Sequence, residues 1–338
     1  MIKESKRYGN VALFVPHEGC PHQCSFCNQR HIAGKVDPLT PDQVVAACNR
    51  AAQQVARGRQ MEIAFFGGSF TAIAREQMVA LLQAAYPFVQ QGVFEGIRVS
   101  TRPDAVDQEV LSLLRRYGVT TIELGAQSMD DAVLAENRRG HTAAHVETAA
   151  RLIKDAGFRL GLQMMTGLPG DSDEGALQTA QRLAALQPDM VRIYPTLVID
   201  HTPLAEQYRS GRYQPPALQD AIALCARLLA YFEDECDIRV IRLGLHDEED
   251  MHRHYLAGPM HPAFRERCEA RLLFERIRAQ LPNKTSGAAT VWVSPSRVSQ
   301  AVGHKRENVD AFAAIGWNIT VVADAALDGK DIRVEVIA

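Results

Sequence analysis

One ten-residue stretch decides the fold expected of this chain: Gly19-Cys20-Pro21-His22-Gln23-Cys24-Ser25-Phe26-Cys27-Asn28. Its three cysteines follow a C-x3-C-x2-C spacing, directly after an apolar run at residues 11–15. Thiolates are soft ligands, and three of them on one short loop can hold three irons of a cubic 4Fe-4S cluster. The fourth iron then lacks a protein ligand and can bind a small molecule. The alternative interpretation of such a loop is a zinc site or a set of unrelated thiols.

The same loop resembles the signature of the radical S-adenosylmethionine (SAM) superfamily. Gly19 precedes the first cysteine, and the aromatic Phe26 precedes the last one. The resemblance implies that Cys20, Cys24 and Cys27 bind a 4Fe-4S cluster, with SAM as the second cofactor.

Composition restricts the compartment and the kind of partner. A net charge of −3 over 338 residues excludes the basic field of a dedicated nucleic-acid coat protein. No apolar run approaches the ~20 residues of a membrane span, so we expect no membrane partner. The seven cysteines are odd in number and three are clustered, which argues against a secreted disulfide framework. We therefore expect a reducing, cytoplasmic location.

Apolar strand-like runs alternate with amphipathic helical segments through the first 245 residues. The expected strands cover residues 11–15, 61–66, 96–101, 119–124, 158–165, 189–194 and 238–243. Such alternation predicts parallel strands joined by right-handed crossovers. Seven strands with the cysteine loop after the first suit an α/β fold, a partial TIM-type (βα)6-7 barrel whose site lies at the carboxyl ends of the strands. A doubly wound sheet is the alternative.

Glycines and polar residues follow the expected strands, where a SAM molecule would lie. The candidate contacts are Gly67, Gly68, Ser100, Arg102, Gln127, Arg138, Gln163 and Gly167. The glycines leave room for the methionine and adenine parts of the ligand. Ser100 and Arg102 can bind a ribose or a carboxylate, and Arg138 can clamp a carboxylate bidentately. Alternatively, Arg138 and Arg139 form a solvated surface pair.

Several ordered motifs give a closer resemblance, to the radical SAM domain of the Elongator catalytic-subunit family. They are Gly-Gly-Ser-Phe-Thr at 67–71, Thr-Arg-Pro-Asp at 101–104, Glu-Leu-Gly-Ala-Gln-Ser at 123–128, Asn-Arg-Arg-Gly-His-Thr at 137–142, Met-Met-Thr-Gly-Leu-Pro at 164–169, and residues 188–196. The resemblance covers residues 10–265. It implies that the cluster passes an electron to SAM, and that the resulting 5′-deoxyadenosyl radical abstracts a hydrogen.

The chain departs from that family in three respects. Its cysteines are compactly spaced, Ser100 replaces an expected acidic residue, and no segment resembles the family's acetyltransferase domain. The acetyl-CoA-dependent carboxymethylation of wobble uridine is therefore not carried over to this chain.

The last eighty residues predict a small α+β domain, with the division at 1–258 and 259–338. Two helices at 296–302 and 307–315 flank the turn Gly303-His304-Lys305-Arg306. Backbone amides and cations at such a turn can contact phosphates, although an ordinary helical hairpin is the alternative. The segment resembles the KH modules of the bacterial elongation factor NusA, whose G-x-x-G loop clamps single-stranded nucleic acid. Here Arg306 replaces the second glycine.

These features together predict a radical SAM enzyme that modifies RNA, with tRNA as the leading candidate. Flavodoxin or ferredoxin is the expected electron donor. The alternatives are a radical SAM oxidoreductase acting on a tetrapyrrole or another metabolite, and a non-catalytic RNA-binding iron-sulfur protein.

Overall fold

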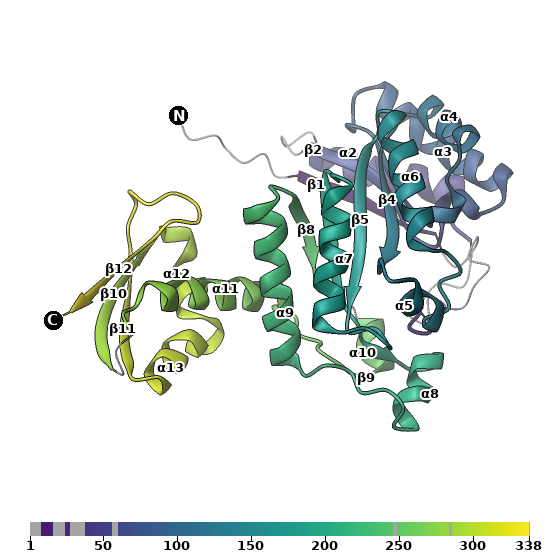
Figure 1. Cartoon of the computed structure of the whole chain (residues 1–338). Coiled ribbons are helices and arrows are strands. Elements are labelled where there is room, and N and C mark those ends of the chain that lie inside the picture. Colours follow the sequence, from purple (N-terminus) through teal and green to yellow (C-terminus); the bar gives the residue numbers. More distant parts are fainter. Residues whose placement is uncertain are drawn as a thin grey trace.

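The computed structural model describes residues 8–15, 24–27, 38–55, 60–245, 249–283 and 286–337. Its main feature is a parallel sheet of seven strands (Figure 1). The strands are β1 (Tyr8–Val15), β2 (Gln60–Gly67), β3 (Ile97–Thr101), β4 (Val119–Gln127), β5 (Arg159–Thr166), β6 (Met190–Pro195) and β8 (Arg239–Leu243). The helices between them are α2 (Pro41–Val55), α3 (Arg75–Gln90), α4 (Gln108–Arg116), α5 (Asp131–Glu136), α6 (Ala143–Asp155), α7 (Asp173–Ala185) and α9 (Leu218–Ala230).

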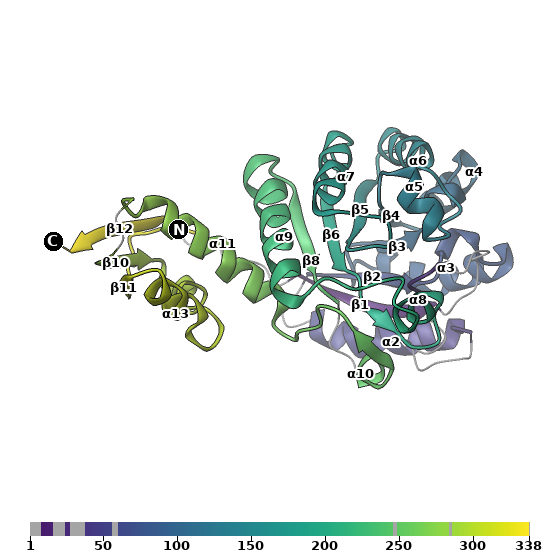
Figure 2. The ribbon, with the colours of Figure 1, turned by 60° about the horizontal axis from the view of Figure 1, so that its bottom comes forward.

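The strand order decides between the two predicted architectures. The strands follow one another as β1-β2-β3-β4-β5-β6-β8, without the reversal that defines a doubly wound sheet. The sheet curls, helices cover its outer face, and β1 and β8 are its two edges (Figures 1 and 2). The partial TIM-type barrel is confirmed.

Local chemistry explains where the outer helices begin. Thr40 and Gln43 form a reciprocal capping box at the start of α2, with Thr40 Oγ1 accepting from Gln43 N at 3.3 Å. Asp107 and Ser172 accept backbone N–H groups in the same way at the starts of α4 and α7. These caps satisfy donors that the first helical turn leaves unpaired.

Three additions after β6 are not predicted from the sequence. They are the antiparallel pair of short strands β7 (Val198–Ile199) and β9 (Tyr255–Ala257), and the helices α8 (Pro203–Arg209) and α10 (Glu249–His254). Each is shorter than eight residues, so its periodic pattern is too brief to stand out in a sequence. Figure 1 places them together at the lower side of the barrel, beyond the arrowheads of β4 and β5.

The C-terminal part forms a separate three-stranded sheet in the order β11-β10-β12. Its elements are α11 (Phe264–Gln280), β10 (Gly287–Val293), α12 (Val298–Val302), α13 (Glu307–Ala314), β11 (Trp317–Ala323) and β12 (Ile332–Ile337). β10 pairs with β11 in parallel and with β12 in antiparallel orientation. The small α+β unit is present.

Helix α11 belongs to both hydrophobic cores. Phe264 and Cys268 pack in the barrel core, whereas Leu273, Phe274 and Ile277 pack beneath the C-terminal sheet. Figures 1 and 2 show this single helix running from α9 to the small sheet. Any boundary drawn in sequence therefore falls beside a continuous helix that both units share.

Candidate functional site

The predicted SAM contacts lie on one edge of the barrel, because parallel strands end on the same side of their sheet. Gly67 ends β2, Arg102 follows β3, Gln127 ends β4 and Gly167 follows β5. Gly68 donates its N–H to Val15 O, at the end of β1, at 2.8 Å. This is the edge at which barrel enzymes place their sites.

Gly67 illustrates why the edge needs a glycine. Its φ is +107°, and a Cβ at this position would lie 2.7 Å from Val15 O and 2.6 Å from the Phe14 ring. A side chain would have to displace the end of β1, from which the cysteine loop departs. The glycine turn therefore brings the ends of β1 and β2 close together.

The turn that contains Cys24 and Cys27 is held from two sides; Cys20 lies outside the described residues. Ser25 donates its hydroxyl to Asn137 Oδ1 at 2.6 Å and its N–H to Asn137 O at 3.1 Å. Its own carbonyl accepts the N–H of Leu204, in α8, at 2.8 Å. Phe26 packs in the apolar clusters beside the ends of β5 and β6. Cys24 is consequently buried, with 6% of its surface exposed.

The segment after α5 alternates between buried and exposed residues. Asn137, Arg139 and His141 are buried, whereas Arg138 is exposed and adopts a positive φ of 55°. The predicted carboxylate clamp, Arg138, thus lies on the surface beside a buried second arginine. Sequence spacing alone does not separate the two arginines, because both neighbours are polar; the alternation of burial at Asn137, Arg139 and His141 appears only in the structure.

Arg139 is a site residue that the sequence analysis did not select. Its Nη1 donates to Cys24 Sγ at 3.1 Å, and its Nη2 donates to Gly125 O at 2.7 Å. Its guanidinium also lies over the ring of Phe26, 6.0 Å from the ring centre. Among the ion pairs of the described residues, none joins Arg139 to a carboxylate. A buried cation is stabilised by an electron-rich acceptor, and Cys24 Sγ is the acceptor that Nη1 of Arg139 reaches.

Arg102 is buried and pairs with groups of the protein. It forms a bidentate ion pair with Asp104, with both N···O distances at 2.8 Å, and donates to Arg139 O at 2.8 Å. Burial by itself raises the pKa of Asp104, but the hydrogen bonds and charge of Arg102 outweigh burial and lower it. In this arrangement Arg102 fixes the backbone that carries Arg139.

Gln127 offers an unused acceptor beside the cysteine turn. It has a positive φ of 67°, and its Oε1 is buried without a hydrogen-bond partner among the described residues. Buried polar atoms are normally paired, so an orphaned acceptor at a strand end fits a ligand that donates a hydrogen bond. Gln127 thus presents an unpaired acceptor at the end of β4.

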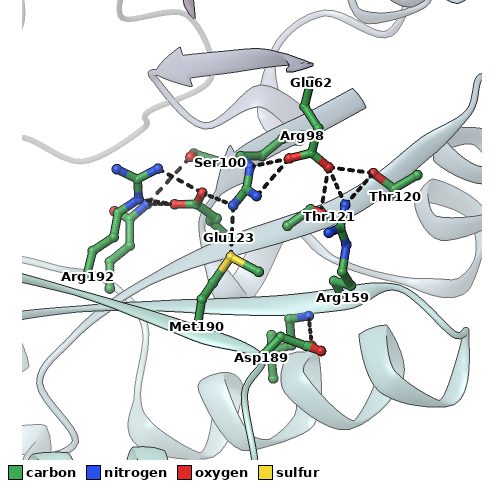
Figure 3. A network of polar contacts seen from close by, with 12 residues as sticks. Glu62, Arg98, Ser100, Thr120, Thr121, Glu123, Arg159, Asp189, Met190 and Arg192 are labelled. Carbon is green, nitrogen blue, oxygen red and sulfur yellow. Dashed lines mark hydrogen bonds and ion pairs between the residues drawn. The ribbon is translucent and has the colours of Figure 1, made fainter. Parts of the chain in front are cut away.

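The barrel interior contains a network of ion pairs in place of the layers of branched side chains usual in such barrels (Figure 3). Arg98 donates to Glu62 Oε2 at 2.8 and 3.0 Å and to Glu123 Oε1 at 2.6 Å. Arg192 donates to both oxygens of Glu123 from the opposite side. Arg159 also pairs with Glu62. Each buried carboxylate therefore meets more than one guanidinium.

Glu123 connects this network to the predicted ligand contacts. Burial raises its pKa, but the charges and hydrogen bonds of Arg192 and Arg98 outweigh burial and hold it below the usual range. Its Oε2 accepts from Gln163 Nε2 at 3.0 Å, and the same amide lies 3.5 Å from Ser100 Oγ. Gly161, the register partner of Glu123, has no side chain that would clash with it. The ionic network thus fixes Gln163 and Ser100 at the base of the site.

His141 gives a testable pH dependence. Burial, together with the positive charge of Arg139, lowers its pKa from 6.5 to about 4. The folded protein thus favours neutral His141, so its contribution is complete above pH 6.5 and is lost as the pH falls toward 4. Between about pH 7.5 and pH 5, we expect wild type to lose about 2 kcal/mol of unfolding free energy relative to His141→Gln. Urea unfolding of both proteins at each pH measures this, and an unchanged difference would contradict it.

The predicted nucleic-acid turn lies between α12 and α13. His304, Lys305 and Arg306 are exposed, and Arg306 has a φ of +70°. Arg306 therefore adopts the backbone conformation that a glycine would favour at this position. The turn is fixed to α11 through the Arg267–Glu307 ion pair at 2.8 Å. His261 and His304 stack edge to face, with their ring centres 5.1 Å apart.

An open parallel barrel with a buried cysteine turn at its carboxyl edge defines a class of fold, the barrels whose sites lie at this edge. The profile of the radical SAM superfamily matches residues 14–183, and that of the radical SAM C-terminal domain matches residues 188–273. The chain belongs to the radical SAM superfamily. It is a radical SAM enzyme, and its family binds a 4Fe-4S cluster and SAM.

Individual relatives point to the Elongator group. Elongator complex protein 3 of Bos taurus is 39% identical over 138 residues, which is 40% of this chain and 25% of the relative. The tRNA uridine(34) acetyltransferase of Methanocaldococcus jannaschii is 33% identical over 129 residues, 37% of this chain and 24% of the relative. The match therefore spans about a quarter of the length of these proteins.

A solved structure shows the same fold. The archaeal Methanocaldococcus infernus Elp3 with an N-terminal deletion superimposes with a TM-score of 0.61 at 20% identity, covering 81% of this chain and 63% of that one. Among the described residues, no helix is both long and apolar enough to cross a membrane.

Proposed function

We propose that this protein cleaves SAM reductively and uses the resulting radical to modify RNA, with tRNA as the leading substrate. Cys20, Cys24 and Cys27 would hold the 4Fe-4S cluster. Gly67, Gly68, Ser100, Arg102, Gln127, Arg138, Gln163 and Gly167 would line the SAM site. When bound, the cluster and SAM supply a 5′-deoxyadenosyl radical that abstracts a hydrogen atom from the substrate.

The main support for the proposed binding of the cluster and SAM is the buried Cys24 sulfur, which accepts a hydrogen bond from Arg139 at the edge where the strands end. Asn137 orients the cysteine turn, and Glu123 orients Gln163. Helix α8 and the packed Phe26 cover the turn, which limits access of water. The chain's own residues thus bind, orient and shield the reacting groups.

Two observations support RNA as the substrate. One relative is named a tRNA uridine(34) acetyltransferase, and an exposed cationic turn is fixed to the helix that joins the two units. Lys305 and Arg306 would contact phosphates, His304 would lie beside them, and Gly303 would form the turn that lets the nucleic-acid backbone approach. We place the division between the barrel and a KH-like unit at residue 258.

The test combines the reduced, reconstituted protein with SAM and either cellular RNA or a pool of small metabolites. We expect 5′-deoxyadenosine to form faster with RNA. Stimulation by metabolites alone would refute the RNA substrate while leaving SAM cleavage intact. Flavodoxin and ferredoxin, the proposed electron donors, can be compared with dithionite in the same assay.

The free cysteines among the described residues suit a reducing cytoplasm, our proposed location.

The cationic turn can be tested separately. The double change Lys305→Ala with Arg306→Ala should weaken RNA binding and reduce the slope of log affinity against log salt by about two, because two phosphate contacts are lost. The matched control is Arg50→Ala with Arg116→Ala, on the outer helices α2 and α4, which removes the same charge. Filter binding at several salt concentrations measures the slopes. Equal slopes for both double variants would exclude the turn from the interface.

A further inference from the structure

The contact between Arg139 and Cys24 joins a fixed cation to a sulfur atom. The Nη1–Sγ distance is 3.1 Å, and only 7% of the surface of Arg139 is exposed. The second branch of the guanidinium donates to Gly125 O at 2.7 Å, at the end of β4. The planar fork of an arginine can make both contacts at once, whereas a lysine ammonium cannot span them in the same way.

Hydrogen bonds fix the backbone segment that carries Arg139. Arg102 donates to the carbonyl of Arg139 at 2.8 Å and is itself clamped by Asp104. Two residues earlier, Asn137 binds Ser25, the neighbour of Cys24, and also donates to Val133 O and Pro169 O. The donor and the sulfur are thus attached to the same supporting segment. Their separation is set by the fold.

We propose that Arg139 raises the reduction potential of the 4Fe-4S cluster by donating a charge-assisted hydrogen bond to Cys24. The inference rests on the proposed function, in which Cys24 is a cluster ligand. Reduction adds negative charge that is shared with the thiolate sulfurs, and a buried donor stabilises the reduced form more than the oxidised form. Hydrogen bonds to ligating sulfurs are one of the ways in which proteins set such potentials. Arg139 is in this sense a positioning and tuning residue.

The decisive experiment is a potentiometric titration of the reconstituted protein, monitored by electron paramagnetic resonance in the absence of SAM. Arg139→Gln removes the positive charge and the two-branched guanidinium donor. At a fixed solution potential, we expect about a tenfold lower ratio of reduced to oxidised cluster, equivalent to a midpoint about 59 mV more negative. A merely structural residue would change cluster content without moving the midpoint.

Two further variants sharpen the result. Arg139→Lys keeps the charge but loses the fork, so its midpoint should lie between those of wild type and Arg139→Gln. Arg151→Gln removes the same charge from an exposed position on the outer helix α6, where water screens it, and should leave the midpoint unchanged. The readout for this control is the potential alone.

The outcomes separate the two proposals. A wild-type protein that takes up no cluster refutes the proposed function. A loaded wild type whose midpoint equals that of Arg139→Gln refutes the tuning role only. If Arg139→Gln retains no cluster, Arg139→Lys decides: a midpoint equal to wild type overturns the inference. Loss of the cluster from both variants, with circular dichroism unchanged, also overturns it and assigns Arg139 to holding the loop.

Discussion

Cys24→Ala is expected to abolish SAM cleavage, reducing 5′-deoxyadenosine to the background of the iron-free protein. The change removes one of three proposed thiolate ligands and leaves Nη1 of the buried Arg139 without its sulfur acceptor. The variant should nevertheless fold, because Ser25 and Phe26 still tie the turn to Asn137 and to the apolar cluster behind it. Iron and sulfide content, the visible absorption of the cluster and 5′-deoxyadenosine formation measure the effect.

The matched control is Cys236→Ala. Cys236 precedes the amino end of β8, whereas the cysteine turn lies at the carboxyl ends of the strands. It is a free thiol. We expect this variant to keep both cluster content and SAM cleavage. A Cys24→Ala protein with wild-type iron content and activity would show that Cys24 is not a ligand and that the cluster is held elsewhere.

Glu123→Gln is expected to lower the free energy of unfolding by about 3–5 kcal/mol, because it removes the shared partner of two buried guanidiniums. The substitution is nearly isosteric, so it changes charge with little change in volume. Arg98 and Arg192 would then face each other with one carboxylate, Glu62, left in the network. With one acceptor oxygen in place of two, glutamine at this position cannot accept from both arginines and from Gln163 as the carboxylate does, so SAM binding should also weaken. Urea unfolding and equilibrium dialysis with SAM measure the two effects.

Glu147→Gln is the control for this prediction. Glu147 pairs with Arg182 on the surface, where the two side chains are 42% and 47% exposed. Solvent screens such a pair, and its loss should cost no more than about 1 kcal/mol. If Glu123→Gln were no more destabilising than Glu147→Gln, the interior network would contribute nothing to folding.

The barrel could be predicted because its information is local. Alternating apolar runs and helix caps such as Thr40 and Asp107 define the elements. The parallel connection of strands through helices then restricts the topology. The short elements α8 and β7 could not be predicted in this way, since a few residues carry no periodic pattern.

The site was predictable only in outline. Glycine turns and strand ends mark the correct edge, but side-chain direction depends on the path of the backbone. The positive φ of Arg138 turns it to the surface and its neighbour Arg139 toward Cys24. Likewise, Glu123 and Arg192 are 69 residues apart, and only the register of neighbouring strands brings them into contact.

The sequence by itself determined the superfamily that the chain resembles, the positions of the seven strands and the edge expected to carry the cofactors, because spacing, periodicity and turn chemistry are properties of nearby residues, whereas the order of the strands in the sheet came from the tertiary structure. The tertiary structure decided which charges are buried and which sulfur receives a cation. It also decided that α11 is shared by both cores. These features depend on distances between segments far apart in the chain, and only the packed barrel fixes those distances.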